Sequence, residues 1–234
     1  MEARGTGRGG GRRRPMPSPF FVQANVDAAV ARLATAGATV AGIAAHVGDE
    51  ADVKRLIDFT VSTFGKIDVL VSNAAVNPFA GEILDHPDSA LTKIFDVNVL
   101  AAIRLVRAAA PFFAPAASVV FISSITAYRP ESPIAVYAVS KTALVALSRA
   151  LAEELAPSGV RVNAVAPGTV PTKFAAALVE SDEMRRESVE RTLLKRLGTP
   201  ADVAGAVAFL ASDDAAYVTG ECICVSGGML TARL

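Results

Sequence analysis

The chain has 234 residues, 23 basic and 23 acidic side chains, and 52% apolar residues. This length suits one domain with a sizeable core, and a formal net charge of zero argues against general electrostatic attraction to nucleic acid. No apolar run approaches the roughly 20 residues that a membrane span needs, so we expect no membrane partner. The only cysteines, Cys222 and Cys224, alternate along an apolar run. Side chains so placed share one face of a strand and rarely form a disulfide, which favours a reducing compartment.

Residues 1–22 differ in composition from the rest. Residues 1–19 are rich in arginine, glycine and proline, and such a segment buries too little apolar surface to order itself. We expect a disordered leader, with a basic tail or an organelle-targeting peptide as alternatives. The glycines at 7–11 follow no strand and precede arginines, so they do not form a phosphate-binding loop. Nucleic-acid binding through the leader is weakly supported, because aromatic residues are not interleaved and no basic patch follows.

Helix and strand patterns alternate from residue 23 onward. Helices are predicted at 25–37 with Asn25 as the cap, and at 49–64, 89–113, 137–155, 182–197 and 201–211. Short apolar runs predict strands at 39–47, 67–72, 118–123, 160–165 and 221–225. This alternation is typical of an α/β protein with a doubly wound parallel sheet and helices on both faces.

Tyr137 and Lys141 are four residues apart at the start of a predicted helix. They therefore share a helix face, and a nearby cation lowers the pKa of a phenol, ordinarily about 10, toward values useful in proton transfer. Ser124 ends the 118–123 strand and is placed to hold a substrate oxygen beside the phenol. Alone, tyrosine and lysine at this spacing are also common on exposed helix surfaces.

Three predicted strands end in residues suited to a site. Asn73-Ala74-Ala75, Ser124 and Pro167-Gly168 each follow a strand, and ligands of parallel sheets bind beyond the carboxyl ends. The alternatives are ordinary turn chemistry at these positions, and for Asn98, within a helix, a bond to a carbonyl one turn back. His46 and His86 have no partner pattern, and we expect no metal site.

These residues together resemble the short-chain dehydrogenase/reductase family. The resemblance covers residues 23–234 and is closest to the branch of peroxisomal dehydrogenase/reductases and their tropinone-reductase-like plant relatives. It implies a Rossmann-like fold in which Tyr137 is the general acid/base that exchanges a proton with the substrate oxygen. By the same resemblance, Lys141 lowers the pKa of that tyrosine and binds the nicotinamide ribose, Ser124 orients the substrate, and Asn98 holds a water of the proton relay.

The resemblance also implies a cofactor, partners and a location. Its cofactor is NADP(H), with NAD(H) as the alternative, bound by Asn73, Ala74, Ala75, Tyr137, Lys141, Pro167, Gly168 and Thr172. The substrate is a small carbonyl compound or alcohol, and retinoid-like, aromatic-ketone and acyl substrates stay open. We also expect a homodimer or homotetramer. The last three residues, Ala232-Arg233-Leu234, match a relaxed peroxisomal address, with the cytoplasm as the alternative.

One family feature is missing from this sequence. Family members begin with a strand, a T-G-x-x-x-G-I-G loop and a helix, whereas no strand–glycine–helix order occurs here, so we expect the N-terminal strands to be truncated. We therefore expect NADPH to bind at least about a hundredfold more weakly than in a complete relative, a loss of about 2.7 kcal/mol or more, and little or no activity. Two functions result: a carbonyl reductase, or a non-catalytic family member that acts as a subunit or interaction partner.

Overall fold

The computed structural model describes residues 23–172, 174 and 181–229, and the chain divides into two compact units between Ala45 and His46. The described part of the first unit contains one helix, α1 (Gln23–Thr35), followed by a turn at Gly37 with φ +85°. The helix starts two residues before Asn25, so the predicted cap at Asn25 is wrong. Gly42 lies close to this helix, since a Cβ there would be 2.5 Å from the Val26 side chain.

The predicted strand at 39–47 is wrong. Residues 38–46 are irregular in the structure, although their sequence is apolar and β-branched. A strand forms only where a neighbour satisfies its backbone groups, and the described residues supply no such neighbour for this segment. Local preference alone does not make a strand.

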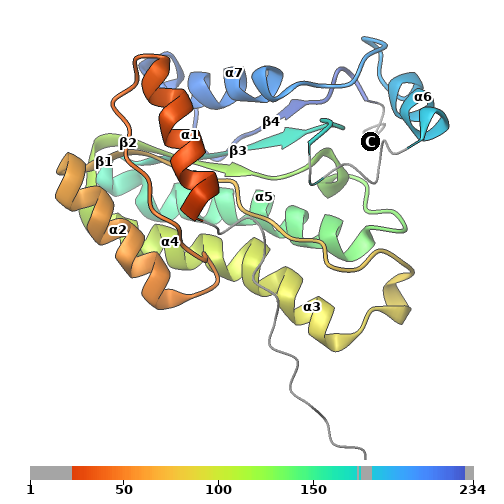
Figure 1. Ribbon diagram of the computed structural model, residues 1–234, viewed down its shortest axis with the longest axis horizontal. Coiled ribbons are helices and arrows are strands. Elements are labelled where there is room, and N and C mark those ends of the chain that lie inside the picture. Colours follow the sequence, from red (N-terminus) through yellow and green to blue (C-terminus); the bar gives the residue numbers. More distant parts are fainter. Residues whose placement is uncertain (1–22, 173, 175–180, 230–234) are drawn as a thin grey trace, which may run out of the picture. The chain divides into compact units, whose positions relative to one another are not determined.

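The second unit is built on a parallel sheet of four strands (Figure 1). The strands are β1 (Ile67–Ser72), β2 (Phe113–Ile122), β3 (Arg161–Pro167) and β4 (Cys222–Val225), in that spatial order. All three pairings are parallel. The α/β fold class is therefore confirmed, and each of the four strands overlaps an apolar run predicted after residue 66. Strand β2 begins five residues before its predicted start, and β3 ends two residues after its predicted end.

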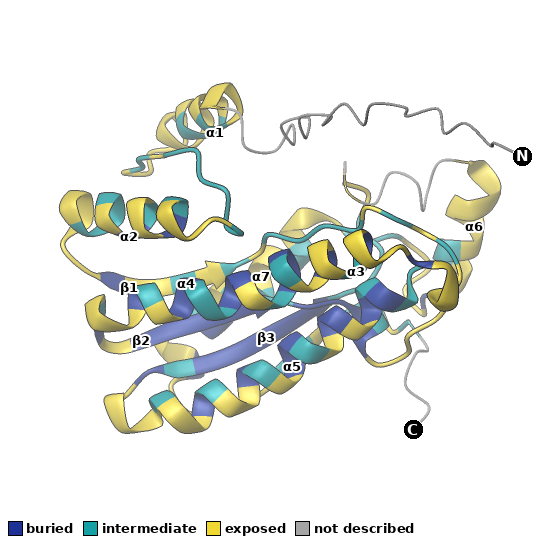
Figure 2. Cartoon of the chain, turned by 90° about the horizontal axis from the view of Figure 1, so that it is seen from below, coloured by how far each residue is buried: buried dark blue, intermediate teal, exposed yellow. Residues whose placement is uncertain are grey.

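Helices cover both faces of this sheet (Figure 1). One face carries α2 (Glu50–Phe64), α4 (Ala101–Ala109) and α5 (Ala135–Leu155), and the other carries α7 (Pro200–Ala211). The central strands β2 and β3 are almost wholly buried between them (Figure 2). The predicted polar helix at 182–197 is shorter, since α6 (Asp182–Glu190) ends seven residues earlier.

The long helix predicted at 89–113 is interrupted. It consists of α3 (Asp88–Phe95), one π-helical stretch (Asp96–Leu100) and α4, with a 3₁₀ turn before β2. A π stretch adds a residue to the turn and is frequent at functional sites. Here it contains Asn98, which is only 1% exposed.

The sequence predicts no segment long and apolar enough to span a membrane, and the helix α5 departs from this expectation. The segment Ala135–Ser158, which contains α5, is long and apolar enough to cross a bilayer by length and composition alone. Within the fold, however, Leu144 and Ala152 of this helix pack into a core with Phe121 of β2 and Val162 of β3. The hydrophobicity of α5 thus corresponds to its place as a core helix.

Candidate active site

The predicted site residues meet at one edge of the sheet. Asn73 directly follows β1, Ser124 is the second residue after β2, and Gly168 directly follows β3. Because these strands are parallel and in register, their carboxyl ends lie at the same edge, where ligands of such folds bind.

Ser124 begins the 3₁₀ turn Ile125–Ala127 in an extended conformation. Its Oγ accepts hydrogen bonds from the backbone N–H of Thr126 at 3.2 Å and from the Thr126 hydroxyl at 2.9 Å. These two bonds occupy the acceptor sites of the serine oxygen. The Ser124 hydroxyl also interacts with the neighbouring Tyr137 phenol, where it favours the ionised form.

Tyr137 lies in the first turn of α5. Burial raises the pKa of its phenol to about 12, and the hydrogen bond with Ser124 acts in the opposite direction. The lowered phenol pKa expected from the Tyr137–Lys141 pair is therefore not present in this structure. At neutral pH the phenol keeps its proton, so the group is set to donate.

Lys141 lies one turn after Tyr137 and is 1% exposed. Its Nζ donates to the backbone carbonyl of Ile122 at 2.8 Å and lies 5.6 Å from the centre of the Tyr137 ring. Burial lowers the pKa of this ammonium to about 8. An ammonium has three donors, so the ammonium can donate further hydrogen bonds to a ligand.

Asn98 connects three parts of the site. Its Oδ1 accepts from the Val76 N–H at 2.8 Å, and its Nδ2 donates to the Val76 carbonyl at 3.1 Å and to the Ser140 Oγ at 3.0 Å. Both amide hydrogens are thus used, and the bond to a carbonyl one turn back is not what holds this side chain. Asn98 fixes the loop after β1 against α5.

Ser140 and Ser123 were missed by the sequence reasoning. Ser140, fully buried, donates from Oγ to the Tyr137 carbonyl at 2.6 Å while accepting from Asn98. Ser123 donates from Oγ to the Lys141 carbonyl at 2.8 Å. The available signal was that Ser140 follows Tyr137 by three residues, on the same helix face.

The predicted cofactor residues border the carboxyl edge of the sheet or the segments that follow it. Ala74 and Ala75 are half-buried, whereas Asn73 and Thr172 are exposed. Gly168 is required by packing, because a Cβ there would lie 2.9 Å from the Ser226 Cα. That these groups and Lys141 hold the nicotinamide and its ribose stays a prediction. No strand in the described residues is followed by a glycine loop and helix that would hold a pyrophosphate.

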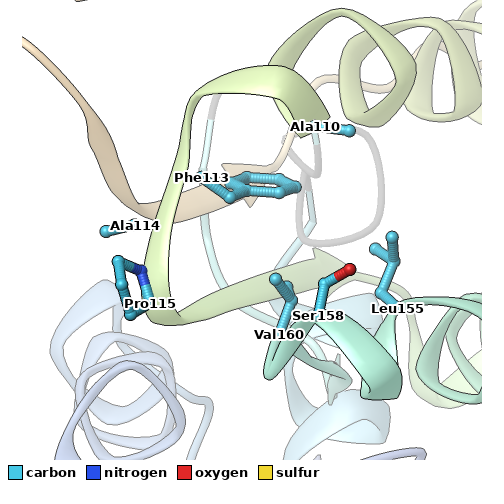
Figure 3. A pocket seen from close by; sticks show the side chains of 7 residues that line it. All are labelled: Ala110, Phe113, Ala114, Pro115, Leu155, Ser158 and Val160. Atoms are coloured by element: carbon cyan, nitrogen blue, oxygen red, sulfur yellow. The ribbon is translucent and has the colours of Figure 1, made fainter.

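The remaining candidate features lie elsewhere or are structural. The hollow lined by Phe113, Pro115 and Val160 lies near the amino ends of β2 and β3 (Figure 3), opposite the catalytic edge. His86 is 7% exposed, its ring packs against Phe79 at 4.6 Å, and its Nδ1 lies 3.0 Å from the Glu82 carbonyl. These contacts hold His86 within the segment between β1 and α3.

This fold and this site define a class of proteins: α/β oxidoreductases with a serine, tyrosine and lysine at the carboxyl edge of a parallel sheet. Comparison with known proteins places the chain within it. Residues 20–230 match the family model described as enoyl-(acyl carrier protein) reductase. The chain belongs to the short-chain dehydrogenase/reductase family, whose members use NAD(H) or NADP(H).

Individual relatives cover most of the chain. Tropinone reductase-like 3 of Erythroxylum coca is 53% identical over 206 residues, which are 88% of this chain and 80% of that protein. Dehydrogenase/reductase SDR family member 4 of Homo sapiens is 46% identical over 88% of this chain and 75% of its own. Among solved structures, a blue fluorescent protein from a metagenomic library in complex with NADPH has a TM-score of 0.80 at 31% identity, covering 88% of this chain and 82% of that one.

Proposed function

We propose that this protein interconverts a carbonyl and a secondary alcohol with NADP(H), and that Tyr137 exchanges the proton at the substrate oxygen. The observation that carries the proposal is the convergence of three groups at one sheet edge. Tyr137 is protonated, Ser124 is hydrogen-bonded to it, and Lys141 is a buried cation one helical turn away. The relative solved with NADPH supports the choice of cofactor.

Each group has a distinct task in this proposal. In the reductive direction the Tyr137 phenol donates its proton to the carbonyl oxygen, as a general acid does. The Ser124 hydroxyl orients that oxygen and stabilises the charge that develops on it. Lys141 lies one turn away, and its positive charge stabilises the Tyr137 phenolate that remains after the proton is donated.

The cofactor, when bound, supplies the hydride that the substrate carbon accepts. In the proposal Lys141 donates hydrogen bonds to the nicotinamide ribose, and Pro167, Gly168 and Thr172 contact the nicotinamide end. The Asn73–Ala75 segment lines the groove for the rest of the molecule. For Asn98 we propose a positioning role, because its amide hydrogens are used within the protein. In the proposal the second acceptor site of its Oδ1 holds the relay water.

Phe174 bears on the substrate class. Its ring centre lies 5.6 Å from that of Tyr137, and the side chain is 45% exposed. An aromatic wall beside the proton donor favours a carbonyl compound with an apolar or aromatic substituent. Retinoid-like, aromatic-ketone and acyl substrates all meet this requirement.

A second candidate function is a non-catalytic family member. The absence of a further strand beside β1 and of a glycine loop for a pyrophosphate, among the described residues, favours it. Such a protein would act as a subunit or interaction partner. Isothermal titration with NADPH separates the two: the absence of binding at millimolar NADPH supports the non-catalytic function, and saturable binding supports the reductase.

Label transfer tests the proposed activity directly. The purified chain is incubated with NADPH deuterated at C4 of the nicotinamide and with a panel of apolar ketones and aldehydes. Although the missing glycine loop should keep turnover low, we expect deuterium on the carbinol carbon of at least one product, because mass spectrometry detects the product of a few turnovers. Saturable NADPH binding without label transfer to any carbonyl class would overturn the proposed reaction.

We further propose a homo-oligomer that pairs through the helices carrying Asn98 and Tyr137. Leu100 and Val139, on these helices, are 45% and 40% exposed although apolar, and covering such side chains stabilises an interface. Light scattering should give a dimeric or tetrameric mass. A monomeric mass for cofactor-bound protein would contradict this assembly.

A further inference from the structure

The two cysteines of the chain occupy one face of β4. Ile223 and Val225 pack toward Leu210 of α7, and side chains alternate along a strand. Cys222 and Cys224 therefore point to the opposite face, where Cys222 packs at the border of the core beneath α5. Both thiols are free, with Cys222 half-buried and Cys224 exposed. They form an accessible pair at an edge strand.

The Tyr128 phenol interacts with the two cysteine side chains. Tyr128 follows the 3₁₀ turn Ile125–Ala127. Burial is the main cause that raises the pKa of this phenol, and side-chain hydrogen bonds with Cys222 and then Cys224 add to it. Burial also raises the pKa of the Cys222 thiol, while the hydrogen bond from Tyr128 acts against this shift. The two thiols and this phenol thus form one cluster on this face of β4.

The strand geometry excludes a direct bond between these sulfurs. Residues two apart on a strand have Cα atoms roughly 6.5 Å apart, with parallel Cα–Cβ bonds. A disulfide requires Cβ atoms about 3.8 Å apart, with side chains directed toward each other. Joining Cys222 to Cys224 would therefore distort β4. A single atom placed between the two sulfurs removes that requirement, because each sulfur then bonds to the bridging atom instead.

The number of ligands selects the bridging atom. A structural zinc ion takes four protein ligands, and the described residues contain no group of three or more His, Cys, Asp or Glu side chains placed to hold a metal. The bridging atom must therefore need only two thiolate ligands from the protein. It must also be a soft Lewis acid, since thiolates prefer soft partners. Trivalent organoarsenic compounds meet both conditions.

We propose that Cys222 and Cys224 form a dithiol site that binds soft thiophilic species of this kind, trivalent arsenicals above all. For an arsenic oxide R–As=O the reaction is a condensation. Two S–H bonds and the As=O bond are broken, two As–S bonds form, and the oxygen leaves as one water with both thiol hydrogens. No atom changes oxidation state, so no oxidant is needed. Tyr128 remains protonated and hydrogen-bonds to the bound sulfurs.

Phenylarsine oxide is a suitable probe because the chain has no other cysteine. We expect the native protein to take up one equivalent, with the mass of a single condensed adduct and the loss of both titratable thiols. A dithiol competitor, 2,3-dimercaptopropanol, should remove the probe, whereas an equal thiol concentration of 2-mercaptoethanol should not. Cys222→Ser and Cys224→Ser should each weaken binding by at least about a hundredfold, since one As–S bond is lost.

Circular dichroism and thermal unfolding of both variants check that the fold is intact. Tyr128→Phe keeps both thiols and removes only the hydroxyl. It should still bind one equivalent of the probe, but with a higher dissociation constant than the native chain. The proposal is overturned if either single-cysteine variant binds as tightly as the native chain. It is equally overturned if the folded chain takes up no probe while the urea-unfolded chain takes up one equivalent, because the strand would then hold the thiols apart.

Discussion

The side-chain amide of Asn98 forms hydrogen bonds with both backbone groups of Val76, accepting from its N–H at 2.8 Å and donating to its carbonyl at 3.1 Å. A third bond, to the Ser140 hydroxyl, connects the pair to the helix that carries Tyr137 and Lys141. The π stretch between α3 and α4 contains this amide. The loop after β1 and the catalytic helix are thus held by one buried side chain.

Replacing Asn98 should therefore destabilise the protein. Asn98→Ala removes three hydrogen bonds and leaves the Val76 N–H and carbonyl without these partners, which should lower the free energy of unfolding by about 2–3 kcal/mol. Urea denaturation monitored by circular dichroism measures this. Ser62→Ala is the control, because it removes only an exposed hydrogen bond from the Ser62 hydroxyl to the Phe59 carbonyl. It should lower the free energy of unfolding by less than about 0.5 kcal/mol. A similarly small loss for Asn98→Ala would contradict the structural role.

Lys141 should give the protein a distinctive pH dependence of stability. Its folded pKa of about 8 lies below the ordinary value of 10.5, so between these values the unfolded state binds more protons and stability rises with pH. Below pH 8 the cost of burying the charge is fully present. Relative to Lys141→Met, the native chain should gain about 2 kcal/mol of unfolding free energy between roughly pH 7.5 and 9.5.

Urea titrations of both proteins at the two pH values measure this difference. Lys66→Met, at a surface lysine whose side chain is 61% exposed, serves as the control and should follow the pH dependence of the native chain. Parallel curves for the native chain and Lys141→Met would show that the ammonium is not desolvated.

The outer side of β1 should promote association. Val69 and Val71 of this strand are each 40% exposed, beside a row of backbone groups that no strand of the described residues pairs. Exposed apolar edges of this kind favour aggregation, and lysines on them oppose it. Val69→Lys with Val71→Lys should slow the growth of light scattering on incubation at fixed concentration. Phe64→Lys is the control, because it replaces an apolar side chain that is 47% exposed at the end of α2, and it should change the growth of light scattering little. If Phe64→Lys slowed this growth as much as the double variant does, the role of the β1 edge would be contradicted.

Much of the fold was predictable because its signals are local. Strands β1 to β4 are short apolar runs, and α2 is capped by Asp49, whose carboxylate accepts from the N–H groups of Ala51 and Asp52. The segment 39–47 has the same local character but forms no strand, because pairing depends on a neighbour that sequence preference does not report. The π stretch Asp96–Leu100 adds a residue to one helical turn. A prediction from the 3.6-residue period of a regular helix does not detect such an insertion.

The site was partly predictable for the same reason. The spacing of Tyr137 and Lys141 identifies a shared helix face, and the structure places them together. The spacing does not reveal how deeply the phenol is buried, so the raised pKa of Tyr137 could not be foreseen. The contacts of Asn98 with Val76 and Ser140 join residues 22 and 42 positions away, and only the fold brings them together.

The proposed peroxisomal location depends on Ala232-Arg233-Leu234, which lie outside the described residues. A receptor reads such an address as a free carboxyl-terminal tripeptide. A fluorescent protein fused in front of the last ten residues should give a punctate pattern that coincides with a peroxisomal marker, and deletion of Leu234 should disperse it. Diffuse fluorescence from the intact tail would indicate the cytoplasm instead.

The proton transfer by Tyr137 is the central claim, and Tyr137→Phe tests it most directly. This change removes only the hydroxyl. At a saturating concentration of NADPH we expect the rate of carbonyl reduction to fall by about 10²–10⁴-fold, the usual contribution of a general acid. The dissociation constant for NADPH, measured by titration on the same samples, should stay nearly unchanged. Retention of most of the native rate by Tyr137→Phe would contradict the assignment of Tyr137 as the proton donor.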